Sequence, residues 1–189
     1  MKHLTRGALL AVIMTLAAEG TALASGSKAL PTKSTSAAAQ LAHVKLALTK
    51  YTFAPAAEAD GYVAASPCES TPTDPDQSSY GGAMGFHYVN AAYEKPGPID
   101  PLKPPVLVYA PIGVNGMLQL VAAEYFKPDA DQNVQTDSDR PTLFGRAFDG
   151  PMLGHAPGMP VHYDLHVWLW KFNPSGLFAP WNPDVTCPK

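Results

Sequence analysis

The chain has 189 residues, a formal net charge of −3 and 15% charged residues. Because it has a slight acidic excess and no run of basic side chains, the composition argues against nucleic acid as a partner. It also gives no reason to expect binding to an anionic membrane surface. The 20 prolines predict abundant loops and disfavour a helical bundle.

The first 24 residues have the pattern of a secretory signal peptide. Lys2 and Arg6 give a positive start, an apolar stretch covers residues 7–18, and an A-x-A cleavage site ends at Ala24. The apolar stretch is about twelve residues long, whereas a membrane-spanning helix needs about twenty, so we expect no stable membrane insertion. The sequence therefore predicts cleavage after Ala24 and a periplasmic or secreted protein.

Residues 25–36 are rich in Ser, Gly, Lys, Thr and Ala, which predicts a flexible tether. The remaining residues, 37–189, suffice for a single domain with a real core. Two cysteines, Cys68 and Cys187, are expected to form one disulfide in an oxidising compartment. Free thiols or a metal thiolate are the alternative, for which the isolated spacing offers no support.

A helix is predicted over residues 37–51. Apolar side chains recur there at positions 41, 44, 48 and 51, which places them on one stripe of a helix. Ser36 is a suitable N-cap, and Pro55 stops a simple continuation.

Short extended segments follow a predicted loop over residues 66–85. Asn115-Gly116 is typical of a two-residue hairpin turn, so the strands on either side of it should pair antiparallel. One helix followed by about four such strands predicts an α+β fold, with the N-terminal helix packed on a small antiparallel sheet, many loops and one disulfide. The expected strands cover residues 86–89, 106–109, 117–126 and 163–171.

The last predicted strand carries the chain's most unusual pattern. Side chains alternate between the two faces of a strand. One face therefore holds two imidazoles, a carboxylate and two indoles, while the other face is apolar and suits a core. The polar set is His162, Asp164, His166, Trp168 and Trp170.

Two further residues can complete a site with this face. Glu124 shares a predicted face with Leu118 and Leu120, so its carboxylate is expected on an apolar surface, where it needs a cation or a hydrogen-bond partner. Pairing with an arginine or reaching solvent is the alternative for Glu124. His87 follows a glycine-rich loop, and its alternative role is that of an ordinary core histidine.

These residues predict a site for one divalent metal ion, of the zinc or iron type. Imidazole and carboxylate are the ligands that such ions take when coordination positions stay open. Asp164 is then expected to orient one histidine from outside the ligand set. The predicted ligands are His87, Glu124, His162 and His166.

The competing hypothesis is a non-catalytic module that binds a small organic molecule in a hydrogen-bonded, aromatic-lined pocket. A third hypothesis makes the histidines part of the core of a structural or partner-binding protein. No motif assigns a reaction or an oligomeric state. The residues expected to line the pocket are Tyr88, His155, Asp164, Trp168 and Trp170.

Several long motifs resemble a family of small exported bacterial proteins, and the resemblance covers nearly all of the chain after the signal peptide. It implies bacterial export and assigns no activity to any residue. The motifs are Met84-Gly-Phe-His-Tyr-Val-Asn90, Glu124-Tyr-Phe126, His162-Tyr-Asp-Leu-His-Val-Trp-Leu-Trp170 and Trp181-Asn-Pro183 with Cys187.

Overall fold

A computed structural model describes residues 36–71, 81–95, 97–112 and 116–188. The predicted signal peptide and nearly all of the predicted tether lie outside these residues. The described part has short helices near its start, a mostly antiparallel sheet and one disulfide between Cys68 and Cys187. This agrees with the α+β class. No helix among the described residues has the length and apolar character to cross a membrane.

The N-terminal helix α1 (Ala37–Leu48) continues into a single 3₁₀ turn. The hydroxyl of Ser36 caps it by accepting a hydrogen bond from the Ala39 N–H at 3.3 Å, as predicted. The predicted apolar stripe is buried at Val44 and Leu48, and at Tyr51 in the 3₁₀ turn.

A second helix, α2 (Ala54–Ala59), was not predicted. Pro55 lies at its start, where a missing N–H removes no intrahelical hydrogen bond. The extended backbone of Phe53 separates the 3₁₀ turn from α2, and Pro55 lies in the first turn of α2.

The sheet is larger than the predicted four strands. Its strand order is β1-β3-β4-β5-β9-β8 with β2 paired to β3, and β6 and β7 form a separate hairpin. Residues 66–85, expected to be loop, contain β2 and the start of β3. The bounds are β1 (Val63–Ala64), β2 (Glu69–Ser70), β3 (Ala83–Val89), β4 (Val106–Ile112), β5 (Met117–Pro128), β6 (Thr142–Leu143), β7 (Arg146–Ala147), β8 (Asp149–Met152) and β9 (His162–Val167).

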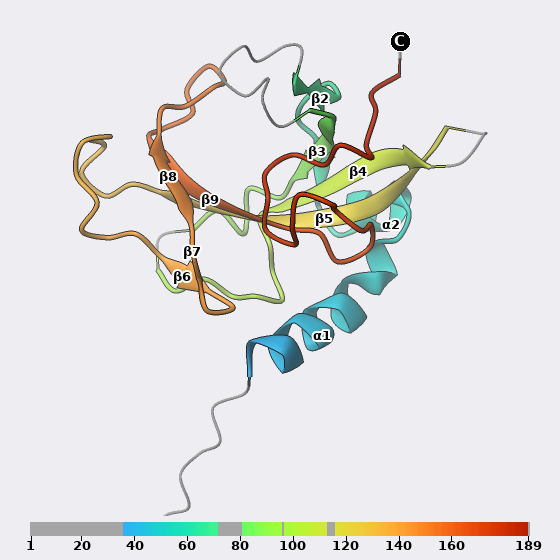
Figure 1. Cartoon of the computed structure of the whole chain (residues 1–189), viewed down its shortest axis with the longest axis horizontal. Coiled ribbons are helices and arrows are strands. Elements are labelled where there is room, and N and C mark those ends of the chain that lie inside the picture. The colour runs from blue at the N-terminus through green and yellow to red at the C-terminus, as the bar shows by residue number, and fades with distance from the viewer. Residues whose placement is uncertain (1–35, 72–80, 96, 113–115, 189) are drawn as a thin grey trace, which may run out of the picture. The chain divides into compact units, whose positions relative to one another are not determined.

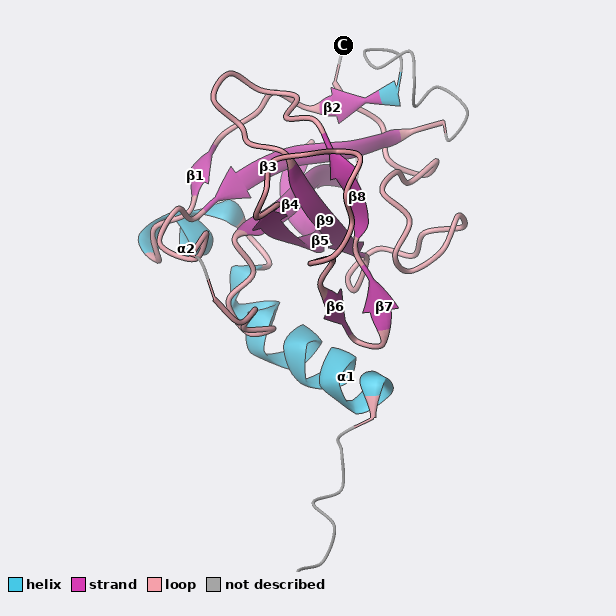
Figure 2. Ribbon diagram, turned by 90° about the vertical axis from the view of Figure 1, so that its left-hand side faces the viewer, coloured by secondary structure: helices cyan, strands magenta, loops and turns pink. Residues whose placement is uncertain are grey.

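The sheet has two different faces. The first, called the helix face, shares one buried apolar cluster with α1, the 3₁₀ turn and α2. In both Figure 1 and Figure 2, α1 lies below the strands. The second, called the tail face, holds a smaller apolar cluster with the C-terminal segment. Members of the second cluster are Ala83, Val108, Ala110, Val121, Ala122, Trp168 and Val185, with Cys187 packed against them.

A β-bulge in β5 decides which side chains reach which face. Val108 pairs with Ala122, but Tyr109 pairs with Leu120, so Val121 is an extra residue. Leu120 consequently packs on the helix face, whereas Glu124 lies on the tail face. The prediction that Glu124 shares a face with Leu118 and Leu120 is wrong, because strict alternation ignores the bulge.

The last strand is also shorter than predicted. β9 ends at Val167, and the Trp168 N–H then donates to the Leu177 carbonyl instead of continuing the ladder. The chain after it returns along the tail face, where Asn182 pairs with Ala83 and Cys187 forms its disulfide. The C-terminal segment therefore lies over the tail face of the sheet.

Candidate metal centre

Three polar side chains from three strands meet on the tail face: His87 from β3, Glu124 from β5 and His166 from β9. Glu124 and His166 are direct cross-strand partners. β4 lies between β3 and β5, and its Val106 stands opposite Glu124. His87 stands opposite Val108, so His87 and Glu124 approach each other diagonally across a strand whose intervening side chains are valines.

The approach of His87 to β4 depends on Gly85. This glycine has φ of +121°, and a Cβ there would collide with the Tyr109 carbonyl oxygen. A residue with a side chain would push β3 away from β4 two positions before His87. The glycine-rich start of β3 thus sets the strand spacing on which the cluster depends.

The atoms that face one another have the spacing of metal ligands. The Glu124 Oε2 atom lies 3.5 Å from the His87 Nε2 atom and 3.7 Å from the His166 Nε2 atom. All three ligand atoms lie within 4.8 Å of one another. Two atoms bound to zinc at about 2.0–2.1 Å with tetrahedral angles are about 3.3–3.4 Å apart. A cation at their centre therefore needs only small adjustments of the side chains.

Burial makes these polar groups costly without a further partner. The side chains of His87, Glu124 and His166 are only 10%, 8% and 1% exposed. Glu124 Oε2 and both ring nitrogens of His166 have no hydrogen-bond partner. A buried polar atom without a partner costs about 1–3 kcal/mol. The described cluster can hold a metal ion, and such an ion would remove part of this cost.

The other ring nitrogen of His87 is held from β2. His87 Nδ1 lies 3.1 Å from the Ser66 hydroxyl and 3.3 Å from a Glu69 carboxylate oxygen. Burial opposes ionisation of Glu69, but its hydrogen bond to His87 and the charge of that ring lower its pKa to about 2. This arrangement orients a histidine so that its Nε2 atom points at the cluster.

Sequence reasoning missed Glu69 because it assigned residues 66–85 to a loop. The strand pairing of Glu69 with Gly85 brings its carboxylate beside His87. The only sequence signal was the neighbouring Cys68, whose predicted disulfide ties this segment to the tail.

The two histidines of the cluster differ in their pKa. Burial lowers the pKa of His87, but the hydrogen bond to Glu69 and the charges of Glu124, Glu69 and Asp164 outweigh it and raise the pKa. Burial lowers the pKa of His166, and the charge of Glu124 only partly opposes this effect. These surroundings favour the neutral form of His166 and the charged form of His87, so a metal ion would compete with a proton for the His87 ring.

His162, predicted as a fourth ligand, lies outside this cluster. It lies four positions before His166, which is about 13 Å along a strand. Its ring stacks on Phe126 with centroids 4.8 Å apart, and its Nδ1 atom lies 3.0 Å from the Pro160 carbonyl oxygen. Sharing a strand face with His166 does not bring it to the same site.

Asp164 does not orient a histidine as predicted; Glu69 has that position. Its Oδ1 atom is buried and has no hydrogen-bond partner. Burial first, and then the charges of Glu124 and Asp149, raise its pKa well above the ordinary value.

The predicted pocket residues are divided between the two faces. Tyr88 packs with Tyr109 on the helix face, so its placement in the pocket is wrong. Trp170 also packs against the helix-face cluster, because the strand ends before it. Trp168 is on the tail face, where its indole N–H donates to the Ala179 carbonyl. His155 is exposed, with its ring 5.4 Å from that of His162.

The cluster lies at a cavity of about 410 Å³. Its walls include His87, Glu124 and His166 together with the segment from His155 to Pro160. A second cavity of about 1250 Å³ shares the lining residues Glu69 and Asp164 with it. Coordination positions that the protein does not fill can therefore face space large enough for an organic molecule.

Comparison of the chain with family models, with curated proteins and with solved structures finds no match.

Proposed function

We propose that the protein binds one divalent transition-metal ion, of the zinc or iron(II) type, through His87, Glu124 and His166. The observation that carries the proposal is the convergence of three buried ligand atoms, of which Glu124 Oε2 and His166 Nε2 have no hydrogen-bond partner. Two imidazoles and one carboxylate form a ligand set that zinc and non-haem iron both accept.

Three protein ligands beside a cavity favour a working metal centre over a purely structural one. Structural zinc sites are closed by four protein ligands, whereas catalytic sites keep a position open. A bound ion of this type acts as a Lewis acid and activates water or an organic ligand. In this chain, Glu69 and Ser66 orient His87, and the cavity walls limit what can approach.

Elemental analysis of the purified protein tests this proposal. The protein is produced without a histidine tag, loaded with metal and then dialysed against metal-free buffer. We expect about one equivalent of metal in the unsubstituted protein. His166→Ala and Glu124→Gln should each reduce retention at least tenfold, because each removes one of three ligands.

Two histidine variants serve as controls. His43→Ala changes an exposed residue of α1, and His162→Ala changes a buried histidine of β9 outside the cluster. Both variants should retain as much metal per folded molecule as the unsubstituted protein does. Circular dichroism measures the folded fraction. Equal retention by all variants, or no metal in a folded protein, contradicts the proposal and favours histidines that serve only the core.

We further propose that the protein acts outside the cytoplasm, as a periplasmic or secreted protein of the exported bacterial family that it resembles. The disulfide between Cys68 and Cys187 supports an oxidising compartment, and the pattern of the first 24 residues supports export. N-terminal sequencing of the protein isolated from the periplasm of a bacterial host should begin at Ser25. An intact Met1 would contradict cleavage after Ala24.

A further inference from the structure

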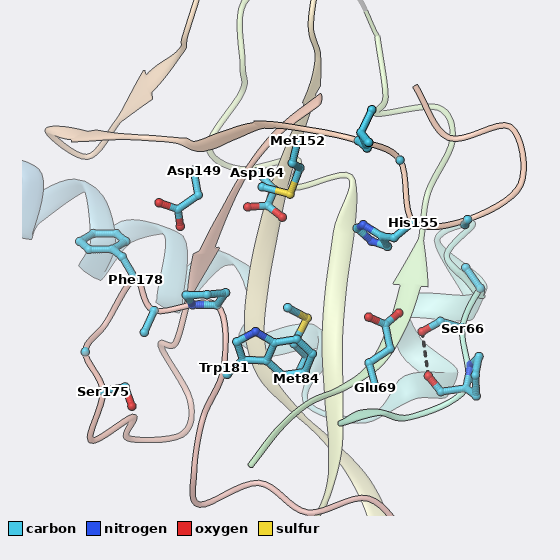
Figure 3. Close-up of a pocket in the computed structure, with 18 of the residues that line it drawn as sticks. Ser66, Glu69, Met84, Asp149, Met152, His155, Asp164, Ser175, Phe178 and Trp181 are labelled. Atoms are coloured by element: carbon cyan, nitrogen blue, oxygen red, sulfur yellow. Dashed lines mark hydrogen bonds between the residues drawn. The ribbon is translucent and has the colours of Figure 1, made fainter. Parts of the chain in front are cut away.

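The larger cavity, of about 1250 Å³, shares the lining residues Glu69 and Asp164 with the cavity at the metal centre and reaches the C-terminal segment. Figure 3 shows Asp149 and Asp164 on one side of it, with Trp181 and Met84 opposite. Its walls include β8 and the residues that follow it, the middle of β9 and the returning tail. None of the proposed metal ligands lines this cavity, so the ligand that it can bind is inferred from its own lining residues.

The charged groups on its walls are mostly acidic. Glu69, Asp149 and Asp164 contribute three carboxyl groups, and Arg146 contributes one guanidinium. Arg146 lies 4.0 Å from Asp149, and both side chains are more than one third exposed, so water screens this ion pair. No ion pair joins Asp164 to a lysine or arginine in the described part of the chain.

Asp164 supplies an independent indication of a ligand. Its residue is 5% exposed, and its Oδ1 atom is buried without a hydrogen-bond partner. Figure 3 shows its carboxyl group pointing into the cavity beside that of Asp149. An oxygen acceptor held in this way gains a hydrogen bond when a donor group enters.

The remaining walls provide apolar and aromatic surface. Trp181 and Phe178 come from the tail, while Met84 and Met152 add thioethers from β3 and β8. Aromatic rings and carboxylates together attract organic cations, since the rings pack against the apolar body and also interact with the charge. An anion would meet the carboxyl groups of Asp149 and Asp164 here, and a purely apolar molecule would leave Asp164 unpartnered.

We infer that this cavity binds a small organic cation, an ammonium group on an apolar or aromatic body, with the ammonium at Asp149 and Asp164. The inference goes beyond the metal proposal and does not depend on it. The ammonium donates hydrogen bonds to the two carboxyl groups, and the apolar body lies against Trp181 and Met84.

Calorimetric titration with benzylammonium tests the inference, with benzyl alcohol and benzoate as neutral and anionic analogues of similar shape. We expect benzylammonium to bind at least tenfold more tightly than either analogue. Asp149→Asn and Asp164→Asn should each weaken it at least fivefold. Glu58→Gln, an exposed carboxylate of α2, is the matched control and should leave binding unchanged.

Asp149 is partly exposed, so its substitution tests the site even if Asp164→Asn fails to fold. Equal binding of benzyl alcohol, no binding of benzylammonium at millimolar concentration, or no effect of Asp149→Asn would overturn the inference. A second equivalent of zinc that disappears in Asp149→Asn would also overturn it, by showing a metal ion in that place.

The titration is carried out on metal-free and zinc-loaded protein. Binding of benzylammonium without retention of zinc would contradict the metal proposal alone. Retention of zinc without binding of benzylammonium would contradict the cation site alone.

Discussion

The two faces of the sheet bury polar atoms in different ways. On the helix face, tyrosine hydroxyls are paired: Tyr62 donates to the Pro104 carbonyl at 2.8 Å, Tyr109 to that of Tyr51 at 2.7 Å and Tyr125 to that of Pro101 at 2.7 Å. On the tail face, several buried side-chain atoms are unpaired, although the Trp168 indole N–H donates to the Ala179 carbonyl there; the helix face has one such atom, Trp170 Nε1. In the described residues, five of the six buried side-chain atoms without a hydrogen-bond partner belong to Glu124, His162, Asp164 and His166.

This difference indicates that the helix face is a largely hydrogen-bonded core, whereas the tail face has polar groups available to a ligand. Native proteins pair nearly all buried polar groups, so each exception needs an explanation. The helix face shows that this chain does satisfy its buried hydroxyls. Of the residues with unpaired atoms on the tail face, Glu124, Asp164 and His166 line the two cavities, and we therefore interpret their atoms as positions for a metal ion and an organic cation.

The largest effect that tests this comparison is expected on the helix face. Leu107 is fully buried there, so Leu107→Ala should lower the free energy of unfolding by about 2–5 kcal/mol through lost burial and the cavity that remains. Urea denaturation monitored by circular dichroism measures this change. Metal retention per folded molecule should stay unchanged, because Leu107 does not touch the cluster.

A substitution at a buried residue of the tail face should raise the free energy of unfolding instead of lowering it. His166 is 1% exposed and neither ring nitrogen has a hydrogen-bond partner. His166→Leu replaces an unpaired polar ring by an apolar side chain. It should raise the free energy of unfolding of the metal-free protein by about 1–2 kcal/mol while abolishing metal retention. A loss of stability comparable to that of Leu107→Ala would make His166 an ordinary core residue and remove the contrast.

The helix face was largely predictable from sequence. Residues 41, 44, 48 and 51 have helical spacing, and three of them are buried where that spacing places them. Ser36 as N-cap and the antiparallel pairing of β4 with β5 also follow from local rules. Such rules work here because each depends on residues close together in the chain.

The tail face was only partly predictable, because its geometry depends on pairing between distant strands. His87, Glu124 and His166 were identified by residue type, and the structure brings these three together. The bulge at Val121 changes the face of Glu124 relative to Leu120, and the pairing of Glu69 with Gly85 brings in an unpredicted carboxylate. The bulge has no signal in a single sequence, and the only signal for the Glu69 pairing is the neighbouring Cys68 with its predicted disulfide.

The end of β9 shows why the indole positions were mistaken. Alternation continued past Val167 would put Trp168 and Trp170 on one face. The Trp168 N–H instead donates to the tail, and Trp170 turns to the helix-face cluster. The missing information was the place at which the tail replaces a neighbouring strand.

The smallest effect concerns an ion pair at the edge of the helix face. Asp60 Oδ2 accepts hydrogen bonds from Lys50 at 2.7 Å and Tyr51 at 2.8 Å. The hydrogen bond from Lys50, followed by that from Tyr51 and the charge of Lys50, lowers the pKa of Asp60 below its ordinary 3.8. A lowered pKa in the folded state stabilises the fold above the ordinary pKa, and this contribution is lost as the pH falls through the folded value.

The pair is exposed, so the contribution should be small, in contrast to the buried carboxyl groups of the tail face. In thermal unfolding, the melting temperature of Asp60→Asn should be slightly below that of the unsubstituted protein near neutral pH. This difference should shrink as the pH falls below about 4. Lys50→Met should diminish the same pH dependence, because it removes the main cause of the lowered pKa. If the deficit in melting temperature of Asp60→Asn stayed constant down to the acid limit of folding, the carboxylate charge would contribute nothing to stability. The paired Asp60 would then not differ from the unpaired carboxyl groups of the tail face in this respect.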